Sequence, residues 1–182
     1  MRVEDAARLI APAVPAAAGA APDGRGAAWA DLGAGGGTFT RALVRLLGAD
    51  AEVHAVDRDA AAIAALRAPG VVGHVADFAD EGAWRALPLP PLDGVLLANA
   101  LHFVPAREQR AVLARLAERL VPNGRLVVVE YDDQPASRWV PHPVSFARLG
   151  EIVPPALSAP NHAGERRSAY GGTMYAAWSR RP

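Results

Sequence analysis

Short apolar runs alternate along most of this chain with segments in which apolar residues recur every three or four positions. The runs fit buried strands, and the segments between them fit amphipathic helices that each bury one face. This alternation predicts a parallel sheet, because each crossover helix returns the chain to the same end of the sheet through a right-handed connection. The predicted strands are residues 27–32, 51–56, 71–76, 92–98 and 126–129.

Capping residues support the helical segments between these strands. Asp59 and Asp80 each precede an apolar-periodic segment, where a side-chain oxygen can accept hydrogen bonds from the first free backbone N–H groups. Pro105 fits the start of another helix, since proline has no N–H to leave unpaired there. Residues 122–124 predict a turn, and residues 145–152 are the one helix predicted after the fifth strand.

The end of the chain breaks the alternation. Residues 168–170 and 173–178 are strand-like runs on either side of Gly171 and Gly172, and two glycines between such runs predict a β-hairpin. The predicted fold class is therefore α/β, a Rossmann-like doubly wound sheet of seven strands. It is mostly parallel and ends in a C-terminal antiparallel hairpin.

The start of the chain differs in composition from the rest. Apolar residues recur there on one face of a short helix, and residues 16–26 are rich in alanine, glycine and proline. Glu4 and Asp5 stand where a secretion signal carries positive charge, and no apolar run reaches the length of a membrane span. We predict a helix and linker over residues 1–26, a single domain over residues 27–182, and a cytoplasmic protein without a membrane partner.

Composition narrows the functional classes. The 19 Lys and Arg residues balance the 19 Asp and Glu residues, so no broad positive field would attract nucleic acid or anionic lipid. The chain has no cysteine, which excludes disulfides, thiolate metal sites and thiol nucleophiles. All these basic residues are arginine, and alanine, glycine and proline are abundant, which is typical of a high-GC bacterial genome.

A glycine-rich turn follows the first predicted strand and opens a helix. Gly33, Gly35 and Gly37 alternate there, and glycine lets backbone N–H groups approach a ligand closely. A dinucleotide-binding turn has the spacing G-x-G-x-x-G, but counting from Gly33 puts Thr38 at the third glycine position. From Asp31 the motif reads D-x-G-x-G-x-G-x-F-T. It resembles the first motif of the class I S-adenosylmethionine-dependent methyltransferases, whose sheets also end in an antiparallel hairpin.

This resemblance implies where the cofactor S-adenosylmethionine would bind. The glycine turn would pass under its methionine part. Asp57 would accept both ribose hydroxyls, while Arg58 would face solvent or stack on the edge of adenine. Asp77 would accept the adenine amino hydrogens, and Phe78 would pack on the ring. Asp57 and Asp77 follow the second and third predicted strands, and ligands of open α/β sheets bind at such strand ends.

The resemblance also assigns Asn99 and Asp31. Asn99 ends the fourth predicted strand in a segment that resembles the family's fourth motif, and it would contact the methionine ammonium group. Asp31 would either balance the positive charge of the cofactor or order the glycine turn. Ala100 and Leu101 follow Asn99, so the segment is not the N-P-P-[YFW] motif of amino-methylating DNA enzymes.

His102 is the predicted catalytic residue. Methyl transfer is an in-line displacement at an activated carbon, so most of the rate can come from alignment and exclusion of water. A base is needed only if the acceptor must lose a proton. His102 is the best-placed candidate, with residues 131–133 behind it, and the alternative is a packing or substrate-shaping role. The spacing of histidines and acids fits no metal site, so no metal is predicted.

The predicted function is S-adenosylmethionine-dependent methyl transfer to an unidentified small molecule. By the resemblance, the acceptor site lies between the leading helix and residues 132–145, and the oligomeric state stays open. One alternative is a protein that binds the cofactor without catalysing transfer. The other is a nucleotide-dependent oxidoreductase, which would need a glycine at position 38 and a Tyr/Lys pair, whereas the chain contains no lysine.

Overall fold

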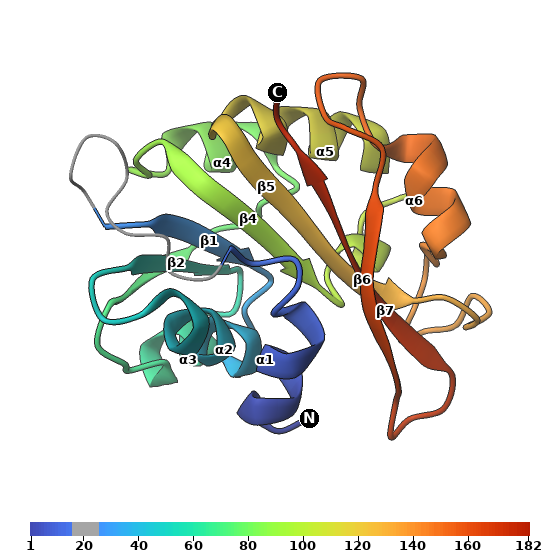
Figure 1. Cartoon of the computed structure of the whole chain (residues 1–182), viewed down its shortest axis with the longest axis horizontal. Coiled ribbons are helices and arrows are strands. Elements are labelled where there is room, and N and C mark those ends of the chain that lie inside the picture. Colours follow the sequence, from blue (N-terminus) through green and yellow to red (C-terminus); the bar gives the residue numbers. More distant parts are fainter. Residues whose placement is uncertain (16–25) are drawn as a thin grey trace.

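The computed structural model describes residues 1–15 and 26–182, so nearly all of the predicted linker lies outside the described residues. A seven-stranded sheet with the order β3-β2-β1-β4-β5-β7-β6 forms its centre (Figure 1). The first five strands are parallel, and β7 runs antiparallel to its neighbours β5 and β6. The predicted fold class is confirmed. The strands are β1 (Ala28–Leu32), β2 (Glu52–Asp57), β3 (Val71–Val75), β4 (Leu92–Ala98), β5 (Leu120–Tyr131), β6 (Asn161–Arg167) and β7 (Thr173–Arg180).

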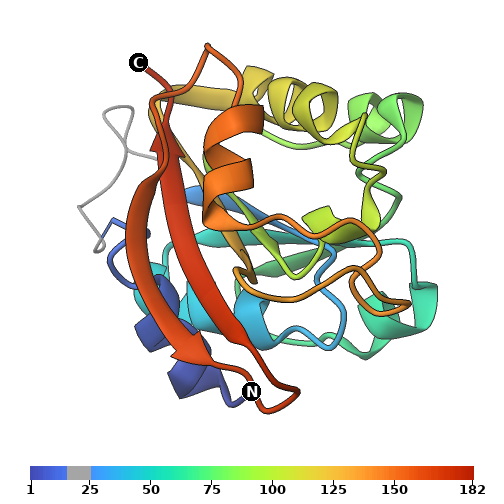
Figure 2. The same cartoon turned by 90° about the vertical axis from the view of Figure 1, so that its right-hand side faces the viewer.

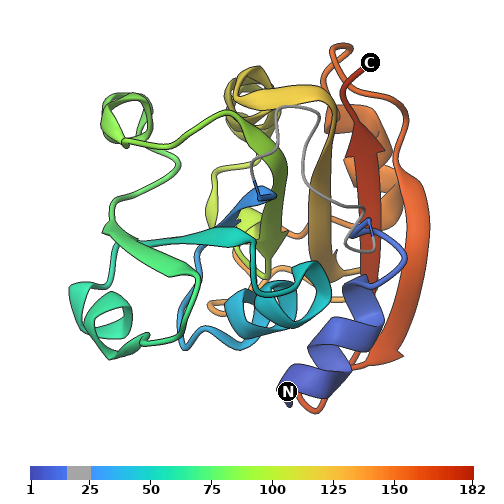
Figure 3. The same ribbon diagram turned by 60° about the vertical axis from the view of Figure 1, so that its left-hand side comes forward.

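Helices cover both faces of this sheet, as the doubly wound pattern requires (Figures 1 and 3). The apolar runs of the sequence fit this position, since β1 is buried along its whole length. One face carries α1 (Val3–Ile10), α2 (Thr38–Leu47) and α3 (Ala60–Ala65). The other carries α4 (Glu81–Ala86), α5 (Gln109–Glu118) and α6 (Phe146–Ile152), and the short 3-10 helix η1 (Leu101–Phe103) follows β4.

The leading helix α1 is part of the core. Its residues Ala6 and Ile10 are fully buried and belong to the same apolar cluster as Trp29 of β1 and Leu43 of α2. Burial of this face removes apolar area from water, which stabilises the helix although it is only eight residues long.

The predicted helix caps are confirmed. The carboxylate of Asp59 accepts hydrogen bonds from the N–H groups of Ala61 and Ala62 at 2.9 and 3.2 Å, at the start of α3. Asp80 caps α4 in the same way through the N–H of Ala83, at 2.7 Å. These caps hold the helix starts next to the strand ends that precede them.

Three local predictions differ from the structure. Helix α5 begins at Gln109 with Glu108 as its N-cap, so Pro105 precedes the helix and does not start it. The first hairpin strand is β6, residues 161–167, and residues 168–172 form the turn that joins it to β7 (Figure 2). Residues 122–124 lie inside the long strand β5, where Asn123 has a positive φ of 66° and the pairing with β4 shifts register. Asparagine tolerates this left-handed conformation, so the strand continues through what the sequence reads as a turn.

None of the described helices has the length and apolar character that crossing a membrane requires.

Candidate active site

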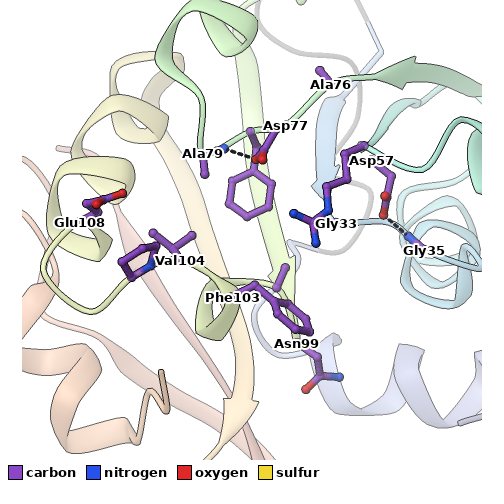
Figure 4. A pocket seen from close by; sticks show the side chains of 14 residues that line it. Gly33, Gly35, Asp57, Ala76, Asp77, Ala79, Asn99, Phe103, Val104 and Glu108 are labelled. Atoms are coloured by element: carbon purple, nitrogen blue, oxygen red, sulfur yellow. Dashed lines mark hydrogen bonds between the residues drawn. The ribbon is translucent and has the colours of Figure 1, made fainter. Parts of the chain in front are cut away.

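A cleft of about 570 Å³ opens where β1, β2, β3 and β4 end (Figure 4). Seven of the predicted site residues line it, and they come from four separate strand ends. They are Gly33, Gly35, Asp57, Arg58, Asp77, Phe78 and Asn99. The parallel arrangement produces this meeting, because the carboxyl ends of parallel strands lie at one edge of the sheet.

The glycine turn is held by backbone hydrogen bonds to β2. The N–H groups of Gly33 and Ala34 donate to the carbonyl of Val56, at 2.8 and 3.1 Å. Gly33 has a positive φ of 73°, and a Cβ at this position would lie 2.7 Å from the Cβ of Ala100. A Cβ on Gly35 would meet no atom closer than 4.0 Å, since this part of the turn faces open space. The turn therefore needs glycine at position 33 and leaves room for a ligand beside Gly35.

Asp57 lies between this turn and the next helix. One carboxylate oxygen accepts a hydrogen bond from the N–H of Gly35 at 2.8 Å, and the other accepts from the N–H of Asp59 at 2.8 Å (Figure 4). These contacts fix the orientation of the carboxylate at the edge of the cleft. Arg58 also lines the cleft.

Asp77 and Phe78 also line the cleft, and a Cβ on Gly33 would lie 3.8 Å from Cε1 of Phe78. The carboxylate of Asp77 accepts a hydrogen bond from the N–H of Ala79 at 2.9 Å, which holds the short connection after β3 (Figure 4). Phe78 is mostly buried in the core, and its remaining exposed surface lines the cleft. A carboxylate next to an apolar ring suits a flat heterocycle with amino hydrogens.

Asn99 has two unusual features. It is one of two non-glycine residues with positive φ among the described residues, at 53°. Its side-chain oxygen is buried without a hydrogen-bond partner among the described residues. A buried acceptor without a partner costs free energy, so its place at the end of β4 points to a ligand donor.

Asp31 and Gly37 are not among the residues that line the cleft. Asp31 is buried and accepts a hydrogen bond from the hydroxyl of Thr40 at 2.6 Å, which ties β1 to α2. The pKa of Asp31 is raised to about 6, chiefly because the carboxyl group is buried; the hydrogen bonds from Thr40 oppose this rise and the charge of Asp57 adds to it. A Cβ at Gly37 would lie 2.3 Å from a methyl carbon of Leu66, so this glycine permits close packing of α2.

A second hollow, of about 640 Å³, adjoins the cleft at Asn99 and Phe103, which line both. His102 lines it as well. The Nδ1 atom of His102 lies 2.6 Å from one carboxylate oxygen of Glu130, and the backbone N–H of His102 donates to the other at 3.1 Å. Glu130 is fully buried. No hydrogen bond joins Nε2 of His102 to any described residue.

Glu130 is the residue that sequence analysis missed. A signal was present, since Glu130 is an acid that directly follows the apolar run 126–129, and a buried acid needs a partner. The sequence analysis expected residues 131–133 to lie behind His102. Tyr131 is the one of these three that lines the hollow. Asp132 and Asp133 instead accept hydrogen bonds from the N–H groups of Phe146 and Thr173, both at 2.7 Å, and so position backbone.

The other four histidines do not line the hollow, although the backbone N–H of His142 donates to the carbonyl of His102 at 3.0 Å. His54 and His74, on β2 and β3, are 3.0 Å apart between Nδ1 and Nε2, and burial lowers the pKa of both rings. His162 is on β6, where it contacts the ring of Phe146, whereas the sequence predicted a loop there. Within residues 1–15 and 26–182, no three His, Asp or Glu side chains gather as a metal site would need.

Comparison with known proteins agrees with this site. The family model described as a methyltransferase domain matches residues 30–126 of the chain. This segment covers the glycine turn and the ends of β1 to β4. The chain therefore belongs to the methyltransferase-domain family, and S-adenosylmethionine is the cofactor that membership implies. This assignment disfavours the oxidoreductase alternative. A comparison with curated proteins gave no match.

Solved structures confirm the fold. The N-methyltransferase NodS from Bradyrhizobium japonicum WM9 is 18% identical, with a TM-score of 0.69 over 99% of this chain and 94% of that one. The 1,6-didemethyltoxoflavin-N1-methyltransferase of Burkholderia thailandensis is 20% identical, with a TM-score of 0.66 over 98% and 77%. A SAM-dependent methyltransferase from Aquifex aeolicus is 16% identical, with a TM-score of 0.64 over 87% and 84%.

Proposed function

We propose that this protein transfers the methyl group of S-adenosylmethionine to a small-molecule acceptor by in-line displacement. The cofactor binds in the cleft, and the acceptor binds in the adjoining hollow. The observation that carries this proposal is that the two cavities meet at Asn99 and Phe103. Two ligands bound there would be neighbours, and a methyl transfer needs donor and acceptor to be in contact.

The residues of the cleft fit the cofactor. The open space beside Gly35 admits a ligand against the backbone, and the unpaired oxygen of Asn99 can accept a hydrogen bond from an ammonium group. Asp57 offers carboxylate oxygens to the ribose hydroxyls. Asp77 offers a carboxylate to the amino hydrogens of adenine, and Phe78 offers an apolar surface to its ring. We propose that Arg58 stacks on the edge of adenine, and that Asp31 and Gly37 act indirectly, by ordering the turn. When bound, the cofactor supplies an activated methyl carbon.

His102 is the proposed general base. Its Nδ1 atom is held by Glu130, which leaves Nε2 as the atom that takes a proton from the acceptor. The buried carboxylate would stabilise the imidazolium ion that forms. In this arrangement Glu130 is a positioning residue, since it acts through His102. The side chains that line the hollow would align the acceptor next to the cofactor.

Solved structures of two neighbours support the cofactor, and one of them supports a small-molecule acceptor. NodS has been crystallised with S-adenosyl-L-homocysteine, and the Burkholderia enzyme with 1,6-didemethyltoxoflavin and S-adenosylhomocysteine. We further propose a bacterial, cytoplasmic setting, on the composition of the chain. A non-catalytic cofactor-binding protein is the second candidate, because every cleft residue named above serves binding.

Thermal melting with S-adenosylhomocysteine tests the proposal. A ligand that binds only the folded protein must raise the melting midpoint. We expect a rise at millimolar ligand and the loss of most of it in Asp57→Ala. Asp50→Ala is the matched control, because Asp50 is an exposed acid outside the cleft. An unshifted midpoint would reject the cofactor site, and a shift without transfer to any of a broad acceptor panel would favour the non-catalytic candidate.

A further inference from the structure

Exposed aromatic side chains gather around the second hollow. Phe103, Trp139 and Tyr170 are 52%, 69% and 90% exposed, and they are the exposed large aromatic residues of the described chain. They come from η1, from the loop after β5 and from the turn between β6 and β7. All three line this one hollow, together with the half-buried Tyr131. Segments far apart in the sequence thus bring their aromatic rings to one place.

Local hydrogen bonds restrain the backbone that carries two of these rings. The hydroxyl oxygen of Ser137 accepts from the N–H groups of Trp139 and Val140, at 3.3 and 3.1 Å, and the N–H of Ser137 donates to the carbonyl of Val140 at 3.0 Å. Ser168 similarly accepts from the N–H of Tyr170 at 3.1 Å. Exposed aromatic rings on restrained turns are typical of ligand contacts, since a rigid ring loses little conformational entropy on binding.

The described residues that line the hollow carry no formal charge other than that of a protonated His102, and the guanidinium of Arg138, 4.5 Å from the centre of the Trp139 ring, is not among them. No aspartate, glutamate or arginine is among the described residues that line it, and its other polar side chains are those of Asn99, Gln134 and Ser137. An ionised acceptor would lose hydration here without contacting an oppositely charged side chain in the lining. A planar neutral ring would instead stack on the exposed aromatic faces.

His102 limits the reacting group. Its Nδ1 is committed to the buried Glu130, and Nε2 hydrogen-bonds to none of the described residues. A hydroxyl group on a ring has a proton to give to Nε2 and becomes a stronger nucleophile as the proton leaves. A tertiary ring nitrogen has no proton, so its methylation would not need His102 and Glu130 as a general base.

From this arrangement we infer that the acceptor is a neutral aromatic compound with a ring hydroxyl, and that the protein methylates that oxygen. This inference rests on the proposed function. The bond between the sulfonium sulfur and the methyl carbon breaks, and its electron pair stays on sulfur. A bond forms between that carbon and the hydroxyl oxygen of the acceptor. The hydroxyl proton moves to Nε2 of His102 and then to solvent.

Binding measurements with four probes test the acceptor class. The full chain is saturated with S-adenosylhomocysteine and titrated calorimetrically with 2-naphthol, decahydro-2-naphthol, 6-hydroxy-2-naphthoate and 2-methoxynaphthalene. We expect 2-naphthol to bind about ten-fold more tightly than the saturated or the charged analogue, as stacking on aromatic faces and the absence of a countercharge require. The methoxy product should bind more weakly than 2-naphthol, because it has no proton to donate to His102.

Single substitutions locate the binding. Trp139→Leu and Tyr170→Leu should each weaken 2-naphthol binding about five-fold while the midpoint shift with S-adenosylhomocysteine is unchanged. Val72→Ala is the control, since Val72 is an exposed apolar residue of β3 outside the hollow. With S-adenosylmethionine, mass spectrometry should identify 2-methoxynaphthalene as the product.

The outcomes separate this inference from the proposed function. Stabilisation by S-adenosylhomocysteine without any preference for 2-naphthol would overturn the aromatic acceptor and leave the cofactor site intact. Equal affinity of the wild-type protein and Trp139→Leu for 2-naphthol would also overturn the inference of an aromatic acceptor. So would methyl transfer to a charged or an aliphatic acceptor but not to 2-naphthol. Absence of stabilisation by S-adenosylhomocysteine would overturn both.

Discussion

The cofactor cleft and the acceptor hollow share a border but are built by different means. The position of the backbone determines the shape of the cleft. The glycine turn is held by hydrogen bonds to Val56 and Asp57, and the residues that line the cleft follow the ends of parallel strands. Side chains shape the hollow, and they come from three segments that are distant in sequence. Substitutions in the cleft should therefore disturb the fold and cofactor binding together, whereas those in the hollow should change the acceptor with little effect on the fold.

The largest effect is expected at Gly33. In Gly33→Val the side chain must adopt a left-handed conformation and displace Ala100, and we expect the free energy of unfolding to fall by about 3 kcal/mol. Binding of S-adenosylhomocysteine should be lost. Chemical denaturation and calorimetry measure both. Gly36→Ala is the matched control, since a Cβ there meets nothing within 4 Å, and a similar loss in it would contradict the argument.

Glu130→Gln tests whether a substitution beside the hollow lowers catalysis without changing cofactor binding. The variant keeps a polar side chain beside His102 but removes the charge that stabilises the imidazolium ion. We expect kcat to fall about 100-fold, in the usual range for acid–base catalysis, while the affinity for S-adenosylhomocysteine is unchanged. Steady-state kinetics over a range of pH measures the loss. If kcat stayed at the wild-type value, the pair would serve packing alone.

Asp31 makes the free energy of unfolding depend on pH. Its pKa in the folded protein is about 6 against a usual 3.8, so the folded state binds the proton more tightly than the unfolded state. The stability that this carboxyl group contributes is therefore complete below pH 3.8 and is lost as the pH rises through 6. Relative to wild type, Asp31→Asn should gain about 2 kcal/mol between pH 4 and pH 7. Urea denaturation at each pH checks this, and a constant difference between the two proteins would contradict it.

The smallest effect is expected at the turn between β6 and β7. The hydroxyl of Tyr131 lies 3.3 Å from the hydroxyl oxygen of Ser168 in a partly buried contact. Tyr131→Phe should cost about 0.5 kcal/mol of unfolding free energy, as expected for a long neutral hydrogen bond. A double-mutant cycle with Ser168→Ala isolates the pair, and full additivity would show that the contact contributes nothing.

Sequence patterns determined the fold class and most of the cleft. Apolar runs, caps at Asp59 and Asp80 and the two glycines near the C-terminus are local signals, since each depends on neighbours a few residues away. The cleft residues follow from the same signals, because the ends of parallel strands necessarily meet. The boundaries of β5 and β6 were harder to predict. Pairing with β4 carries β5 through the predicted turn at residues 122–124, and pairing with β7 places β6 before residues 168–170, which were predicted as strand.

Tertiary structure decided which other side chains join His102 and the segment 132–145 in the hollow. Glu130 and His102 are 28 residues apart, and no local pattern connects a buried acid on one strand to a histidine after another. The meeting of Phe103, Trp139 and Tyr170 likewise depends on how a 3-10 helix, a loop and a hairpin turn pack over the same sheet edge. Backbone periodicity carries information about neighbouring residues, whereas contacts between distant side chains exist only once the chain has folded.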